Sequence, residues 1–178
     1  MFNRFTSTAR LAVIDAVRVA QAGRSAEVTD EHLLAALLAQ PGSTAARLLE
    51  SAGVTSEKVA DAYLAADRKG GLSDAEAESL LRELGIDVDQ VVERVESKLG
   101  AHALAGGSRR RGRRTPFGAT GKSILLGALR EMRALRDRDL GDEHLLLAIA
   151  ARDGVGAQLL ASHGLSYLDL RGRLAKAG

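Results

Sequence analysis

The chain contains Thr29-Asp30-Glu31-His32-Leu33-Leu34 and, 112 residues later, Gly141-Asp142-Glu143-His144-Leu145-Leu146. Because the chain holds only four histidines, a repeated Asp-Glu-His-Leu-Leu indicates an internal duplication. The same offset aligns Phe5 with Phe117, and after a gap of one residue an offset of 111 aligns Gly53 with Gly164. The sequence therefore predicts two copies of one structural unit.

Each copy has the residue spacing of amphipathic helices. Apolar residues recur every three or four positions over residues 5–22, which places them on one face of a helix. Thr29 stands at an N-cap position, followed by two acidic residues in the first turn of the next helix. Hydrophobic residues make up 46% of the chain and aromatic residues only 3%, which favours closely packed helices of Ala, Leu and Val. We predict an all-α fold of two four-helix copies.

The first copy carries an insertion. The pattern Leu-Leu-x-x-x-Gly at residues 48–53 returns at residues 80–85, an offset of 32. We therefore expect an extra helical hairpin at about residues 70–99, so that the first repeat covers residues 1–99.

A linker and the second repeat complete the chain. Residues 100–116 are rich in glycine and arginine, a composition that suits a linker, and residues 117–178 form the second repeat. Because each copy is small and rich in alanine, we expect both to pack together as one domain over residues 1–178.

The linker also holds most of the positive charge of the chain. Without its five clustered arginines the formal net charge falls from +2 to −3. Such a run binds nucleic-acid phosphates in a salt-dependent way or serves as a solvated tether. No aromatic residue interleaves with the run, so we favour the tether and keep nucleic-acid binding as the alternative. The arginines are Arg109, Arg110, Arg111, Arg113 and Arg114.

No arrangement of residues predicts catalysis. The chain has no cysteine, and no Ser-His-Asp set is visible. His32 and His144 lack metal-ligand spacing, and a histidine in the first turn of a helix bonds locally, so we interpret both as structural. Residues 118–123 end in Gly-Lys-Ser, but Pro116 stands where a nucleotide-binding loop needs its first glycine. We expect a protein that is not an enzyme and that binds no metal or cofactor.

Three motifs resemble a known family: Met1-Phe2-x-Arg4-Phe5-Thr6 at the start, Thr29-x-Glu31-His32-Leu33-Leu34, and Leu-Leu-x-x-x-Gly. They are similar to the N-terminal domain of Clp-type AAA+ unfoldases, most closely the ClpC type, over nearly the whole chain. The resemblance implies two four-helix repeats about a pseudo-twofold axis, which bind substrates and adaptors and perform no chemistry.

The resemblance also implies binding residues. ClpC-type domains recognise phosphorylated arginine on client proteins, and that pattern carries over to Thr6 and Glu31 in the first copy. In the second copy Glu143 matches, but Gly118 replaces the expected threonine. A hydroxyl and helix-start amides suit the phosphate, and a carboxylate suits the guanidinium.

The length of the chain suggests how such a domain would act. The sequence ends at Gly178, where an unfoldase would continue into its ATPase modules, so we expect a stand-alone protein. Such a protein would sequester clients, adaptors or cyclic peptide antibiotics of a ClpC-type unfoldase. The family's antibiotic surface corresponds to Phe2 and Arg10. The first residues lack a signal peptide's apolar run and no segment is long enough to span a bilayer, so we expect a cytoplasmic location.

Overall fold

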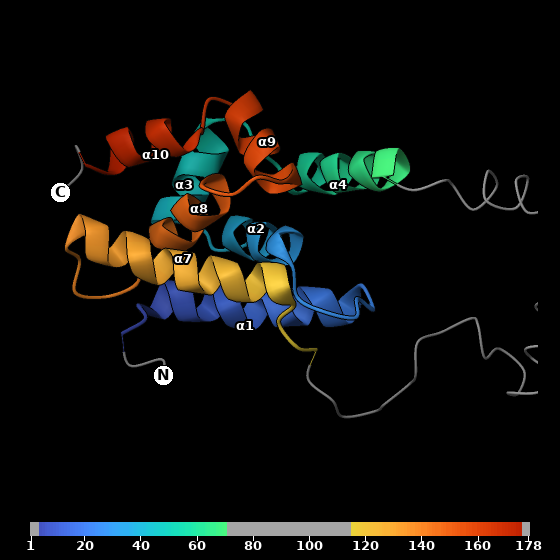
Figure 1. The fold of residues 1–178 in the computed structure, drawn as a ribbon, viewed down its shortest axis with the longest axis horizontal. Coiled ribbons are helices and arrows are strands. Elements are labelled where there is room, and N and C mark those ends of the chain that lie inside the picture. The colour runs from blue at the N-terminus through green and yellow to red at the C-terminus, as the bar shows by residue number, and fades with distance from the viewer. Residues whose placement is uncertain (1–3, 71–114, 176–178) are drawn as a thin grey trace, which may run out of the picture. The chain divides into compact units, whose positions relative to one another are not determined.

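The structure is a computed structural model that describes residues 4–70 and 115–175 (Figure 1), with the side chains of residues 68–70 left out. The hairpin expected at about residues 70–99 lies outside this part of the chain apart from its first residue. So do most of the expected linker, its five arginines, and Phe2. Those predictions therefore rest on the sequence alone.

The described residues form eight α-helices and no strands, which confirms the all-α prediction for this part of the chain. Repeat one contributes α1 (Ser7–Ala22), α2 (Asp30–Leu38), α3 (Thr44–Ser51) and α4 (Ser56–Gly70). Repeat two contributes α7 (Ala119–Leu135), α8 (Asp142–Ala150), α9 (Val155–Ser162) and α10 (Tyr167–Leu174). The first two helices of each repeat start 112 residues apart, and the last two start 111 residues apart. The structure thus repeats with the offsets read from the sequence.

The loops of the two repeats match as closely as the helices. Arg24 and Arg136, both just beyond the first helix of their repeat, have left-handed backbones with φ of 55° and 62°. Gly53 and Gly164, both beyond the third helix, have φ of 69° and 70°, a region that glycine enters without steric cost. The shared backbone angles indicate one local fold used twice.

Two isolated β-bridges connect the repeats crosswise, from Phe5 to Leu140 and from Val28 to Phe117. The backbone N–H of Thr6 donates to the Leu140 carbonyl at 2.9 Å, and the N–H of Gly118 donates to the Val28 carbonyl at 3.1 Å. The start of α1 therefore lies against the segment that precedes α8. The start of α7 lies against the segment that precedes α2.

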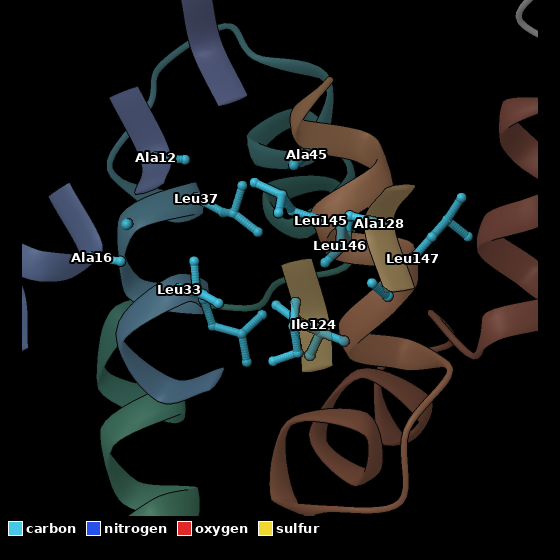
Figure 2. Packing of buried hydrophobic residues seen from close by; sticks show 14 of the residues in the cluster. Ala12, Ala16, Leu33, Leu37, Ala45, Ile124, Ala128, Leu145, Leu146 and Leu147 are labelled. Atoms are coloured by element: carbon cyan, nitrogen blue, oxygen red, sulfur yellow. The ribbon is translucent and has the colours of Figure 1, made fainter. Parts of the chain in front are cut away.

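Helices of both repeats build the core. Figure 2 shows Leu33 and Leu37 of α2 pointing into the same interior as Ile124 of α7 and Leu145 of α8, and all four side chains are 0% exposed. The described residues up to Leu64 and from Thr115 onward belong to one compact unit. The apolar faces of α2 and α8 are thus buried against helices of the other repeat as well as their own.

No single helix in residues 4–70 or 115–175 is long and apolar enough to cross a bilayer. Only α8 and α9 added together have the required composition, and the chain bends by 99° between them.

Candidate ligand-binding site

The histidines of the duplicated motif hold the start of α2 and of α8. His32 Nδ1 accepts a hydrogen bond from the backbone N–H of Thr29 at 3.1 Å. His144 Nδ1 accepts one from the N–H of Gly141 at 2.9 Å. In each case the third residue of the helix closes back onto its N-cap, which satisfies a backbone donor that the helix itself cannot. The structural interpretation of both histidines is confirmed by these bonds.

The other ring nitrogen contacts equivalent residues in the two repeats. His32 Nε2 lies 3.0 Å from Ser25 Oγ, and His144 Nε2 lies 2.9 Å from Asp137 Oδ2. Since Nδ1 accepts a backbone N–H, the contacts assign the ring proton to Nε2, which donates to these oxygens. Glu143 Oε1 also lies 3.3 Å from His144 Nδ1, and one ligand atom of each of Asp137, Glu143 and His144 lies within 4.8 Å of the others. Both nitrogens of the His144 ring therefore have hydrogen-bond partners without Glu143, namely the Gly141 N–H and Asp137.

The aspartate of the motif reaches into the other repeat in one copy and within its own repeat in the other. Asp142 is 3% exposed, and its Oδ2 accepts from the backbone N–H of Ala45, in the first turn of α3, at 2.6 Å. Asp30 instead accepts from the hydroxyl of Tyr63 at 2.5 Å. A Cβ on Gly156, in the first turn of α9, would lie only 2.9 Å from that hydroxyl. In repeat one the Tyr63 hydroxyl therefore lies between Asp30 and α9. In repeat two the equivalent Asp142 contacts α3 directly.

The hydroxyl of Tyr63 stays protonated in this position. Burial, followed by the hydrogen bond and negative charge of Asp30, raises the pKa of Tyr63 above its usual range. Sequence patterns did not single out Tyr63 or Ala45 as partners, because both contacts join helices that are remote along the chain. The repeated aspartate was the available signal, although its partners could not be read from it.

The motif glutamates also have different surroundings in the two copies, because the N-cap residues beside them differ. The Glu143 side chain is 23% exposed and folds over Gly141, so a Cβ at that glycine would lie 2.0 Å from Oε1. Repeat one has Thr29 at the equivalent place, and its own side chain occupies that volume. Glu31, which is partly buried, therefore has no matching space over the N-cap of α2.

The environment of Glu143 favours its neutral form. Burial is the largest effect and raises the pKa of Glu143, and the negative charges of Asp142 and Asp137 act in the same direction. The residue's own backbone N–H and His144 oppose the shift. An ionised Glu143 is consequently held at some cost in stability, as is common for a carboxylate that serves a ligand.

Replacing Glu143 with glutamine is expected to stabilise the protein at neutral pH. The folded-state pKa of Glu143 is raised, so the folded protein binds a proton more readily than the unfolded chain, and stability falls as pH rises through the folded pKa. Glutamine mimics the protonated form at every pH. The gain in the free energy of unfolding from Glu143→Gln should therefore vanish at pH values below 4.5, the ordinary pKa of a glutamate side chain. Urea unfolding of wild-type protein and Glu143→Gln over a pH series measures this gain. A stability difference that does not change with pH would contradict the raised pKa of Glu143.

Thr6 is the N-cap of α1 and lies near the start of α8. Its Oγ1 accepts from the backbone N–H of Ala9 at 3.2 Å and lies 2.9 Å from the hydroxyl of Thr8. Because α1 is 16 residues long, about 24 Å of helix separates Thr6 from the loop that leads to Glu31. The structure does not bring Thr6 and Glu31 together. It places Thr6 beside the segment that carries Glu143.

The other expected residues are placed as follows. Arg10 is exposed in the first turns of α1, and its Nη2 donates to the Phe5 carbonyl at 3.3 Å, close to Thr6. Gly118 is the N-cap of α7 and lies beside the segment that leads to Glu31. Phe2 and the five linker arginines belong to the undescribed part of the chain.

The Gly-Lys-Ser sequence belongs to a helix. Residues 119–135 form α7, so the residues that suggested a nucleotide loop are its first turns. Gly121 is buried, and a Cβ there would lie 2.6 Å from the Val28 carbonyl oxygen. Glycine at this position allows the close approach of the two repeats.

This duplicated geometry matches a known family. A family model described as the Clp repeat (R) N-terminal domain matches residues 4–71 and 69–163. The chain belongs to this family. Clp N-terminal domains are protein-interaction modules of Clp chaperones.

Individual relatives of this Clp repeat domain agree with the family assignment. Chaperone protein ClpB 1 of Parasynechococcus marenigrum (strain WH8102) is 31% identical over an alignment of 171 residues, which covers 94% of this chain and 15% of that protein. The chain thus spans a small fraction of the length of this curated relative.

Solved structures share the fold. The N-terminal domain of the caseinolytic protease associated chaperone ClpD from Arabidopsis thaliana matches with a TM-score of 0.58 at 20% identity, covering 98% of this chain and 96% of that one. A structure titled as a preliminary investigation of a malarial protein secretion system matches with a TM-score of 0.56 at 13% identity, covering 98% and 95%. At these identities the two likenesses concern the fold alone.

Proposed function

We propose that this Clp repeat domain is a non-enzymatic binding module that recognises client or adaptor proteins of a Clp-type unfoldase through phosphorylated arginine side chains. The observation that carries the proposal is the crossed contact between the start of α1 and the segment before α8. That contact joins the N-cap of α1 to Leu140, three residues before Glu143, which supports a site that uses one residue from each repeat.

The two ends of a phosphoarginine differ in charge, and so do the two sides of this site. At the start of α1, the N–H groups of Ser7 and Thr8 have no acceptor within the helix by its geometry, and helix starts favour anions. The Thr6 hydroxyl, which lies 2.9 Å from that of Thr8, would donate to a phosphate oxygen, and Arg10 adds positive charge in the same turns. The carboxylate of Glu143 suits the guanidinium end through charge-assisted hydrogen bonds.

Isothermal titration with phosphoarginine tests the proposal. Wild-type protein is expected to bind, while Glu143→Gln and Thr6→Ala are each expected to bind about ten-fold or more weakly, since hydrogen bonds to charged groups contribute about 1.5–3 kcal/mol. Arginine and inorganic phosphate alone serve as ligand controls, because each offers only one of the two charged ends.

The matched variant Glu31→Gln separates this site from the pairing within one repeat. If Thr6 and Glu143 form the site, Glu31→Gln retains wild-type affinity. Loss of affinity in Glu31→Gln with full affinity in Glu143→Gln would contradict the proposed pairing. Absence of binding by folded wild-type protein would contradict phosphoarginine recognition itself.

A further inference from the structure

The starts of α1 and α7 occupy equivalent places in the two repeats but carry different N-cap residues. Thr6 caps α1, whereas the N-cap of α7 is the buried Gly118. Glu27, from the loop of repeat one, lies directly over this glycine. A Cβ built on Gly118 would be 2.2 Å from Glu27 Cδ and 2.4 Å from both carboxylate oxygens. The carboxylate thus fills the volume that the N-cap side chain fills in the first repeat.

We propose that Glu27 closes the start of α7 to anionic ligands, so that the domain holds one phosphoarginine per chain, at the start of α1. This inference rests on the proposed function, since it concerns the number and place of the same ligands. It makes Glu27, together with Gly118, a determinant of specificity that resides in the repeat opposite to the helix it covers.

Both space and charge support the closure. A phosphate oxygen approaching the N-cap of α7 would meet the like-charged carboxylate of Glu27, an exposed residue whose carboxylate lies where a Cβ on Gly118 would stand. Because Glu27 belongs to the same chain, its effective concentration at this place exceeds that of a free ligand. The dipole of α7 favours a carboxylate near its start, so the arrangement also benefits the helix.

The first repeat escapes this closure because of Thr6. Asp139 is the counterpart of Glu27, since it precedes Leu140 as Glu27 precedes Val28. The side chain of Thr6 already occupies the volume over its own Cα, so Asp139 cannot lie there as Glu27 lies on Gly118. The positive residue of the first turns is present in both repeats, as Arg10 and as the exposed Lys122, so it does not account for the difference.

Titration of phosphoarginine into the full chain tests the inference through its stoichiometry. Wild-type protein is expected to bind one equivalent. Glu27→Ala is expected to bind a second equivalent, at least ten-fold more weakly, and to shift the amide NMR signals of residues 118–121 at high ligand concentration. Glu27→Gln keeps the size of the side chain, so an intermediate result there assigns the remaining closure to space. The matched variant Asp139→Ala should keep the stoichiometry at one.

Each result separates the two proposals. Two equivalents in wild-type protein, or one equivalent in both wild type and Glu27→Ala, would overturn the role of Glu27 and leave the proposed function in place. Binding by Glu27→Ala alone would support the role of Glu27 and overturn the site at the start of α1. If neither folded protein binds, both proposals fail.

Discussion

Replacing Leu145 with alanine is expected to destabilise the protein by about 2–5 kcal/mol, the range for removing a fully buried leucine side chain. Leu145 is 0% exposed and points into the interior that it shares with Leu33 and Leu37 of the other repeat. The change would therefore leave a cavity between the repeats, where helices from both sides limit collapse. Urea unfolding followed by circular dichroism measures the free energy.

Leu168 provides the matched control for this change. Its side chain is 77% exposed, so Leu168→Ala should alter the free energy of unfolding by no more than about 0.5 kcal/mol. Equal effects of the two substitutions would show that Leu145 does not lie in the core. Separate unfolding transitions for the two repeats would show that the repeats do not share a core.

Replacing Asp142 with alanine is expected to cost about 1–3 kcal/mol, because it leaves the buried N–H of Ala45 without an acceptor. The loss combines a charged hydrogen bond with a helix cap, and the bond joins α8 of repeat two to α3 of repeat one. Asp142→Asn keeps an acceptor oxygen in place and should recover part of the loss. Thermal unfolding of wild-type protein, Asp142→Asn and Asp142→Ala measures whether stability decreases in that order.

Asp30 is the equivalent residue of repeat one and serves as the comparison. Asp30 is more exposed than Asp142, and its partner is the hydroxyl of the partly buried Tyr63, whereas the partner of Asp142 is a buried backbone N–H. Asp30→Ala should therefore destabilise the protein less than Asp142→Ala. The reverse order would mean that the contact between Asp142 and α3 contributes little.

Much of the fold was predictable because each copy of a duplicated sequence indicates where the helices of the other copy lie. The offset of the repeated motif located every described helix of repeat two from its counterpart, and Thr29 marked the start of α2. His32 and His144 could be interpreted as structural because a side chain in the first turn reaches its own N-cap. The candidate site was only partly predictable. The family resemblance predicts Thr6, Glu31 and Glu143, and only the crossed contacts between repeats lead us to propose that Thr6 acts with Glu143.

The sequence by itself determined the helices, their order, the duplication and the residue types at each helix start, since these follow from spacing within about one turn. Only the tertiary structure decided which helix starts meet. The β-bridges Phe5–Leu140 and Val28–Phe117 cross between repeats, so Thr6 lies beside the segment of Glu143, and Glu27 lies on Gly118. Periodicity assigns a residue to a face of its own helix, whereas partners more than a hundred residues away are selected by how two complete repeats pack against each other.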